Sequence, residues 1–544
     1  MQGTSVFPRS RYVLRELAVP PARGEPDLAL ALARFLRVKR EKVGEVRILR
    51  KSLDSRKCNQ PLWRYTVEFA FDGVLHHPKA RPMEKPAGSP EGGGGTVATP
   101  RPRLYRPSGP KLAVVGCGPA GMAAALGLAR KGYMVEVFEQ GADVRKRFRD
   151  IRLFVKQNLF NARSNILFGE GGAGAFSDGK LTCRTRTRYT AELLDELVAC
   201  GADPAIAYLS HPHIGTDKLQ LIIENLRKRC EGSGCRFRFD TVVENLNVSE
   251  GKVAGITVAG AVEHFDAVVL AIGLSARPFY ASLLEHGVAM EAKPFSVGIR
   301  VEHPQAMVNG RQLGDKVDTR LTGPAEYFLT WNAEGENLGA YSFCMCPGGV
   351  IVPCADAEDG LFTNGMSYSN RAGAFANSAV VVPVTPEELG GGVLAGLDYI
   401  RDLETRAFAL GGGGFTFPAQ TISAYLENRI DAGALPKTSF LKPLKWADFH
   451  ELFSARVNSA LREAFLAFDR KLPGFIARGL IIGPESRTSS PVRIPRDPET
   501  LESISTPGLF PLGEGAGYSG GIVSSGADGF RLAESWAAWN TVTG

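Results

Sequence analysis

The sequence predicts an α/β protein with one Rossmann-type dinucleotide-binding domain, an inserted α+β domain and a small N-terminal α/β domain. Three observations lead to this prediction. A strand, a glycine-rich turn, a helix and a second strand follow one another over residues 111–139. From residue 293 the pattern changes to alternating strands with intervening helices, and near the C-terminus it returns to strand, glycine loop and helix. A segment rich in proline and glycine separates this stretch from the N-terminal residues, which indicates a separate domain there.

The N-terminal domain is expected to span residues 1–77. Its apolar patterns predict the order strand, helix, strand, strand over residues 12–19, 27–37, 46–49 and 65–71. This order predicts a partial ferredoxin-like sandwich. Residues 78–109 are dominated by Pro, Gly and Arg and could not fill a core, so we expect a linker there.

The stretch KLAVVGCGPAGMAAALGLARKGYMVEVFE at residues 111–139 has the features of a dinucleotide site. Gly116 allows a tight turn, Gly118 lets the backbone approach a pyrophosphate, and Gly121 permits close packing of helix on strand. Free N–H groups at the helix N-terminus favour the phosphate charge. Glu139 ends the second strand and can accept the ribose hydroxyls, which favours FAD or NAD over NADP. We expect the FAD-binding domain over residues 110–292 and 481–544, with the substrate domain over residues 293–480 between them.

Further segments are expected to complete these domains. The glycine-rich residues 164–181 predict a loop lying against the cofactor, because side chains there would block a flat ring or a phosphate. FDAVVLAIG at residues 265–273 predicts a buried strand that returns to the sheet. In the inserted domain a helix is expected over residues 446–470.

Composition narrows the class of protein. The chain has 544 residues, 44% hydrophobic content, a net charge of +7 without a polybasic block, and nine scattered cysteines. These features suggest reduced thiols in the cytoplasm and give little support to nucleic-acid or membrane binding. No metal site is expected, because neither paired C-x-x-C spacing nor a carboxylate cluster accompanies the histidines.

Longer motifs resemble a known group of flavoproteins. The single Rossmann opening, the DAVVLAIG strand and the C-terminal GLFPLGEGAG segment resemble the glutathione-reductase-like FAD superfamily. FGEGGAGAFSDGKL, PHIGTDKL, KPFSVGIRVEHP, SFCMCPGG, TNGMS and RTSSPVRI look like the FAD-dependent, or NAD(FAD)-utilising, dehydrogenases, which have a ferredoxin-like N-terminal domain. That group's RSxDAR segment is similar to KSLDSR at residues 51–56.

The resemblance implies a set of FAD-binding residues. Glu139 would hold the adenosine ribose, Val243 would meet the adenine, and Glu514 stands where an Asp commonly binds the ribityl or phosphate part of FAD. Gly521, Ile522 and Val523 would lie at the N-terminus of the last helix, beside the flavin. The remaining residues of the set are Gly116, Gly118, Ala120, Gly121, Gln140, Gly171, Gly172, Ala173, Gly273 and Gly513.

Residues for proton or electron transfer are less well defined by the sequence. Lys180, Cys346 and Arg487 are the candidates. Cys344 and Cys346 stand two residues apart, so on a regular strand they would share a face but lie too far apart for an easy mutual disulfide. One of them could face the flavin as a thiol, and ordinary half-buried cysteines are an equal alternative.

These observations predict an FAD-dependent oxidoreductase, a dehydrogenase or oxidase that transfers hydride between a small organic substrate and FAD. No second Rossmann fingerprint is present, so NAD(P)H would act only as a transient reductant entering the substrate cleft. The alternatives are a single-Rossmann FAD-dependent monooxygenase and an RNA-modifying flavoprotein. The sequence names neither the substrate nor the electron acceptor nor the oligomeric state.

Overall fold

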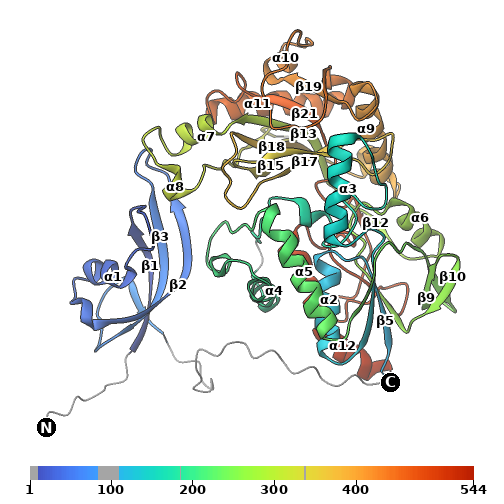
Figure 1. Ribbon diagram of the computed structural model, residues 1–544, viewed down its shortest axis with the longest axis horizontal. Coiled ribbons are helices and arrows are strands. Elements are labelled where there is room, and N and C mark those ends of the chain that lie inside the picture. Colours follow the sequence, from blue (N-terminus) through green and yellow to red (C-terminus); the bar gives the residue numbers. More distant parts are fainter. Residues whose placement is uncertain (1–9, 84–108, 184–185, 336–337, 544) are drawn as a thin grey trace. The chain divides into compact units, whose positions relative to one another are not determined.

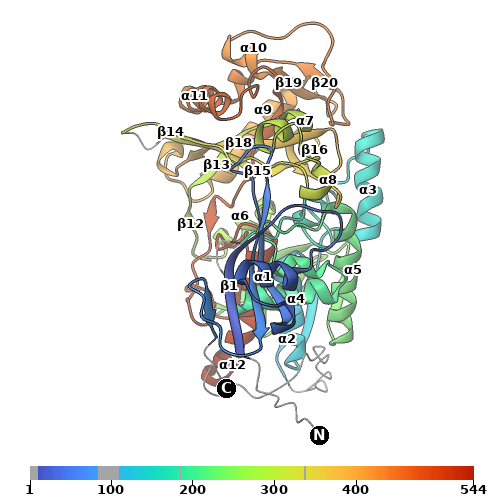
Figure 2. The ribbon, with the colours of Figure 1, turned by 90° about the vertical axis from the view of Figure 1, so that its left-hand side faces the viewer.

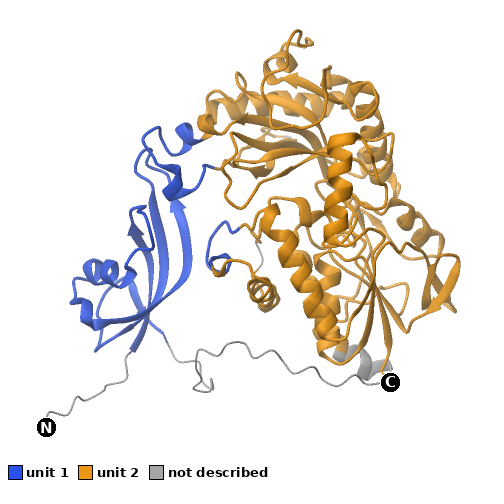
Figure 3. Ribbon diagram, viewed as in Figure 1, with its two compact units in different colours: residues 1–100, 205–212, 309–325 blue, residues 101–204, 213–308, 326–544 orange. Residues whose placement is uncertain are grey.

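A computed structural model describes residues 10–83, 109–183, 186–335 and 338–543 (Figure 1). The chain divides into two compact units, which Figure 3 colours separately. Unit 1 comprises residues 1–100, 205–212 and 309–325, and unit 2 comprises the rest of the chain. The sequence-based division placed the two short segments of unit 1 in the FAD-binding and substrate domains. They belong to unit 1 because their backbone bonds to it: Lys51 N–H donates to Tyr208 O at 2.8 Å, and Asn59 N–H donates to Leu313 O at 2.6 Å.

Unit 1 is built on a four-stranded antiparallel sheet in the order β2-β3-β1-β4. Helix α1 begins after Asp27, whose carboxylate accepts the Leu30 N–H at 2.9 Å, and buries Leu32 and Leu36 in the core of this unit. The elements are β1 Ser10–Val19, α1 Leu28–Leu36, the 3₁₀ turn Arg40–Lys42, β2 Val43–Asp54, β3 Leu62–Phe71, β4 Ala80–Pro82 and the short α8 Thr319–Thr322.

Strand β4 corrects the predicted start of the linker. Ala80 and Pro82 pair with Leu14 and Tyr12 of β1, although the composition of this segment suggested a linker from residue 78. A proline is tolerated here because β4 is an edge strand, where a missing N–H costs no ladder bond. The rest of the predicted linker, residues 84–108, lies outside the described residues.

Unit 2 contains a five-stranded parallel sheet in the order β23-β11-β5-β6-β7. Helices α2 and α12, from opposite ends of this unit's sequence, lie side by side against it (Figure 1). The elements are β5 Lys111–Val115, α2 Pro119–Arg130, β6 Met134–Phe138, α3 Val144–Gln157, α4 Arg188–Ala199, α5 Thr216–Gly232, β7 Arg236–Arg238, β11 Ala267–Leu270, α6 Arg277–Glu285, β23 Leu509–Pro511 and α12 Ile522–Thr543. A separate antiparallel sheet, β10-β9-β8, consists of β8 Val243–Ser249, β9 Lys252–Val258 and β10 Ala261–His264. The structure thus combines a parallel Rossmann-like sheet with an N-terminal antiparallel sheet.

The inserted part of unit 2 is a seven-stranded sheet in the order β14-β15-β18-β13-β21-β19-β20. Helix α11 packs on β14, β15 and β18, and α9 packs on β19, β20 and β21 (Figure 2). The sheet elements are β13 Phe295–Pro304, β14 Thr330–Asn332, β15 Gly339–Cys346, β18 Phe375–Val384, β19 Phe417–Thr421, β20 Leu444–Trp446 and β21 Leu480–Glu485. The other elements are α9 Ala395–Gly411, α10 Ile422–Leu426, α11 Ala455–Lys471, and the two-stranded pairs β16 Val350–Cys354 with β17 Phe362–Met366 and β12 Glu291–Ala292 with β22 Val492–Arg493. Helix α7 Gln305–Gln312 begins in unit 2 and ends in unit 1.

The helix expected over residues 446–470 begins later than predicted. Trp446 ends strand β20, a 3₁₀ turn follows at Phe449–Leu452, and α11 starts at Ala455. The Ser454 side chain accepts the Val457 N–H at 3.4 Å and so caps the helix. Across the described residues, no helix combines the length and the apolar run needed to cross a bilayer.

A buried arginine organises the glycine-rich loop next to the parallel sheet. Arg147 on α3 has no exposed surface, and its guanidinium donates to five backbone carbonyls at 2.7–3.2 Å, those of Asn165, Ile166, Gly169, Glu170 and Gly172. Burial lowers the pKa of Arg147 to about 10, and the Glu139 carboxylate opposes this shift. One side chain therefore fixes the path of residues 165–172.

We expect Arg147→Met to lower the free energy of unfolding by about 3–5 kcal/mol, because it leaves several buried carbonyls without a donor. Urea unfolding of the purified protein measures this. Arg149→Met, an exposed arginine on the same helix, is the matched control and should change stability by no more than about 0.5 kcal/mol. Equal effects of the two substitutions would show that the loop does not depend on Arg147.

Candidate functional site

Unit 2 contains a cleft of about 450 Å³. One wall is formed by the turn between β5 and α2, the glycine-rich loop and the start of α12. The opposite wall is formed by residues of β15, β17 and β21 in the inserted part. The cleft therefore lies where the parallel sheet and the seven-stranded sheet face each other.

The three glycines of the first turn have different roles. A Cβ atom on Gly116, which has φ +102°, would lie 2.3 Å from Ala271 O, and one on Gly121 would lie 2.0 Å from Gly116 O. Both glycines are therefore required by backbone packing. Gly118 has φ −79°, and the nearest atom to an added Cβ would be Gly172 Cα, at 3.9 Å. Gly118 thus keeps a space open in the wall of the cleft.

Two helix N-termini border the cleft. Helix α2 begins at Pro119 directly after Gly118, and α12 begins at Ile522 directly after Gly521. Gly521 has φ +149°, and an added Cβ would meet nothing within 4 Å. The first backbone N–H groups of a helix have no partner within it and carry partial positive charge. Both helices therefore present anion-binding ends to the same cavity.

The Glu139 carboxylate lies in the wall of the cleft and has backbone partners of its own. It accepts N–H groups from Cys117 at 3.0 Å, Gly141 at 2.9 Å and Gly169 at 2.9 Å. Since an ionised carboxylate has about four lone-pair positions, a further donor such as a ribose hydroxyl can still bind. The same side chain thus ties the first turn to the glycine-rich loop.

Most residues predicted to bind the cofactor line this cleft. They are Gly116, Gly118, Ala120, Glu139, Gln140, Gly172, Ala173, Val243, Gly273, Gly513, Glu514, Gly521 and Ile522. Gly121, Gly171 and Val523 do not line it. Gly171 packs against the Ile223 side chain, and its N–H donates to Cys117 O at 2.8 Å, so its role is to position the loop.

This cradle fits FAD. Its open positions at Gly118, Gly273 and Gly521 leave room where any side chain would intrude, and the helix ends supply donors for a pyrophosphate. The two helix N-termini suit a ligand that carries an anionic group.

The catalytic candidates are distributed differently from the prediction. Lys180 lines the cleft, but Cys346 is fully buried, and Cys344 lines the cleft in its place. The reason is a β-bulge in β15 between Phe343 and Cys346, which the spacing of the cysteines did not reveal.

Arg487 also lines the cleft, but acidic partners hold its guanidinium. It bonds Glu404 on α9 at 2.7 Å and Asp356 at 2.5 Å, and it lies 4.5 Å from the ring centroid of Phe362. Burial acts to lower the pKa of Arg487, and the two carboxylates raise it. Arg487 is thus a permanent cation with a structural role.

Sequence reasoning missed the residues of the second wall. Phe343, Phe362, Asn364 and Glu485 line the cleft without belonging to any pattern with known chemistry. Their only signal was their place in or beside the family-like segments, since TNGMS begins just after Phe362.

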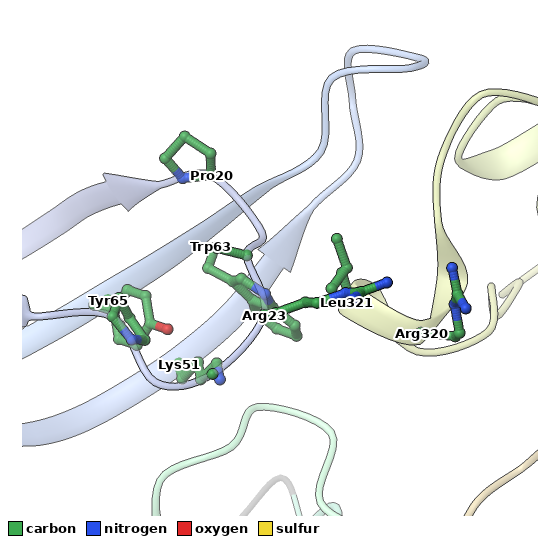
Figure 4. A pocket seen from close by; sticks show the side chains of 10 residues that line it. Pro20, Arg23, Lys51, Trp63, Tyr65, Arg320 and Leu321 are labelled. Carbon is green, nitrogen blue, oxygen red and sulfur yellow. The ribbon is translucent and has the colours of Figure 1, made fainter.

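A second cavity, of about 410 Å³, lies within unit 1 (Figure 4). Lys51, the first residue of the KSLDSR segment, has its ammonium 4.4 Å from the Trp63 ring and 5.6 Å from the Tyr65 ring. Arg23 and Arg320 are the other cations in its wall. No residue predicted for FAD or for catalysis lines this cavity.

Three segments of the chain match known domain families. Residues 294–488 match "FAD-dependent protein, C-terminal domain-like", residues 114–176 match an NAD(P)-binding Rossmann-like domain, and residues 13–70 match a domain of unknown function.

Several solved structures resemble the chain at low identity. CtdE in complex with FAD is 12% identical, with 80% of this chain and 91% of that chain covered and a TM-score of 0.29. L-proline dehydrogenase from P. horikoshii is 11% identical, with 80% and 95% covered and a TM-score of 0.31. Thermovibrio ammonificans THI4 is 17% identical over 33% of this chain, which spans only 64% of that protein, with a TM-score of 0.24. Values this low do not bear on function.

A protein of Clostridium beijerinckii described as uncharacterized is 42% identical over 426 residues, which cover 77% of this chain and 79% of the relative. The chain therefore belongs to the same family as this clostridial protein, and it carries the C-terminal domain of FAD-dependent proteins.

Proposed function

We propose that the protein is an FAD-dependent oxidoreductase that transfers hydride between a small organic substrate and FAD. One observation carries this proposal: a single cleft has a dinucleotide cradle on one wall and the inserted part of the chain on the other. A substrate held by the second wall would lie beside whatever the cradle binds. When bound, FAD supplies the two-electron chemistry that no side chain provides.

The cradle residues have distinct tasks in this proposal. Gly118 and the N-terminus of α2 would receive the pyrophosphate, and Glu139 would bind the adenosine ribose. Val243 would border the adenine, and the N-terminus of α12 would face the flavin. These assignments follow from the resemblance to FAD-dependent dehydrogenases, and Gly118, Glu139 and Val243 all line the cleft.

The second wall would orient the substrate and exclude water. Phe343 and Phe362 supply apolar surface and Asn364 supplies a polar group at this wall, and Lys180 adds a cation from the glycine-rich loop of the opposite wall. Behind them Arg300 makes a bidentate pair with Glu485 at 2.9 and 3.0 Å, with no exposed surface on the arginine. This buried pair fixes the strands that carry the wall.

The proposal is tested by the identity and the redox behaviour of the bound flavin. The purified protein should release FAD on denaturation, identified by chromatography and mass. Anaerobic addition of NADH, NADPH or a panel of small metabolites should bleach the flavin absorbance for at least one compound. Protein that binds no flavin even after incubation with FAD would contradict the proposal.

Gly118→Val should give folded protein without FAD. The φ of Gly118 is allowed for valine, and the added Cβ has no close neighbour. The free energy of unfolding without cofactor should therefore change by no more than about 1 kcal/mol. The added side chain fills the space at the pyrophosphate, so the flavin absorbance should be lost. Gly121→Val is the contrasting variant: its side chain meets Gly116 O, and it should destabilise the fold by about 2–4 kcal/mol. Full FAD retention by Gly118→Val would disprove the cradle assignment.

Glu514 adds a pH dependence to the cleft. Burial raises its pKa to about 7, and Lys293 acts in the opposite direction. Since the folded-state pKa lies above the ordinary value of 4.5, the stabilising contribution is complete below pH 4.5 and is lost as the pH rises through 7.

Glu514→Gln should therefore stabilise the protein at pH 8 by about 1–2 kcal/mol, after allowance for partial solvent screening, and should have no such effect at pH 5. Thermal unfolding of both proteins between pH 5 and pH 8 measures the difference. Glu499→Gln, at an exposed site, is the matched control and should leave the two curves parallel. A constant gap between Glu514→Gln and the wild type across this range would contradict the prediction.

A further inference from the structure

We propose that Cys344 is a nucleophilic thiolate that adds to an α,β-unsaturated carbonyl compound bound in the cleft. This inference deepens the proposed function, because it concerns the same cleft and names a substrate class for its second wall. It stands on four features: the backbone that presents the sulfur, the cations around it, the neighbouring thiol and the cavity in front of it.

The backbone at Cys344 turns its side chain towards the cleft. In the pairing of β15 with β18, Phe343 faces Ala379 and Cys346 faces Asn377, so β15 holds one extra residue at this point. Cys344 takes φ +46°, a left-handed conformation that is uncommon outside glycine. As a result Cys344 lies half-buried in the wall of the cleft, whereas Cys346 has no exposed surface.

Two cationic side chains, Lys180 and Arg300, contact the backbone at this pair of cysteines. The Lys180 ammonium donates to Met345 O, the carbonyl between the two cysteines. The Arg300 guanidinium donates to Cys344 O at 3.4 Å and also reaches Asn377 Oδ1 at 2.8 Å. Both side chains thus hold positive charge against the backbone of residues 344–345.

The remaining charged groups near Cys344 are neutralised by partners of their own. Asp178 pairs with Arg371 at 2.6 Å. Glu485 pairs with Arg300 at 2.9 Å and offsets the charge of that arginine, so Lys180 supplies the larger positive influence on Cys344. The Cys346 thiol donates to the Cys344 carbonyl oxygen at 3.3 Å. The neighbouring Cys346 thiol, Lys180 and Arg300 lower the pKa of Cys344, while burial and Asp178 oppose the shift. The pKa of Cys346 moves upward, since it keeps the proton of the pair. Of the two thiols, the one that lies at the cleft is therefore the more readily ionised.

A thiolate beside an ammonium group suits a conjugated carbonyl compound as the electrophile. In the step, a sulfur lone pair of Cys344 forms the S–C bond at the β-carbon. The alkene π pair moves to the α-carbon and the carbonyl oxygen, and a proton from the Lys180 ammonium or water completes the adduct. No oxidant is needed. A thiolate is a soft nucleophile, and the Lys180 cation stabilises the charge that develops on oxygen. Phe343 and Phe362 give the carbon skeleton an apolar surface.

The test is the rate of labelling of each cysteine, read by peptide mass spectrometry on the purified full-length protein. N-ethylmaleimide, itself a conjugated carbonyl compound, is the probe, and N-acetylcysteine is the free-thiol reference. At pH 6 Cys344 should react at least about tenfold faster than the reference, because thiolate fraction outweighs reduced nucleophilicity. Its rate should change little from pH 6 to pH 8, whereas the reference rises about tenfold per pH unit below its pKa.

Substitutions separate the contributions of Cys346 and Lys180 to the reactivity of Cys344. Cys346→Ala and Lys180→Met should each move the Cys344 profile to higher pH, and Lys131→Met, at an exposed lysine of the same unit, should not. If Lys180 stabilises the developing oxygen charge, Lys180→Met should slow labelling by N-ethylmaleimide more than labelling by iodoacetamide, in which no such charge develops. Equal slowing of the two reagents would overturn the substrate class.

The test distinguishes failure of this inference from failure of the proposed function. FAD content is measured on the same samples. Fast, pH-independent labelling of Cys344 in protein that binds no FAD would contradict only the oxidoreductase proposal. FAD-loaded protein in which Cys344 follows the profile of N-acetylcysteine, or in which Cys346 carries the fast label, would overturn this inference alone.

Discussion

A buried charge cluster holds the two walls of the cleft together. Arg277 on α6, beside the parallel sheet, bonds Asp356 at 2.6 Å, and Asp356 also accepts from Arg487, which in turn bonds Glu404 on α9. Two cations and two carboxylates therefore compensate one another, and all but Arg277, which is partly exposed, are buried. Removal of Arg487 would leave two buried carboxylates without their shared partner. Together with the Asp178–Arg371 pair at 2.6 Å, this cluster joins the inserted part of unit 2 to the part that carries the dinucleotide cradle.

The parts of the structure that sequence predicted well are those where a local pattern has a single physical solution. Gly116 and Gly121 can be nothing but glycine, because a Cβ atom would lie within 2.3 Å of a carbonyl oxygen. The strand, turn and helix around them follow from the same 29-residue stretch, residues 111–139. Most of the cradle was therefore predictable, including distant members such as Gly273 and Glu514, which were identified through resemblance.

The parts that were missed depend on tertiary contacts that leave no local pattern. Arg147 resembled its neighbours in a basic helix, and only the loop folded around it shows that it is buried. Arg487 looked like a free cation until its partners on other elements were known. The bulge places Cys344, rather than Cys346, in the wall of the cleft. It consists of one extra residue of β15 in the pairing with β18, and the sequence of β15 alone does not show this. The positions of the catalytic candidates were for this reason the weakest prediction.

The parallel sheet has a consequence for the order in which the protein matures. Its central strand β5 begins at Lys111, but its edge strand β23 begins at Leu509, and the helix that borders the cleft follows at Ile522. A ribosome delivers residues from the N-terminus onward, so the first turn exists long before its partners are synthesised. A cradle that includes the N-terminus of α12 as well as that of α2 is therefore complete only after Ile522 has been synthesised.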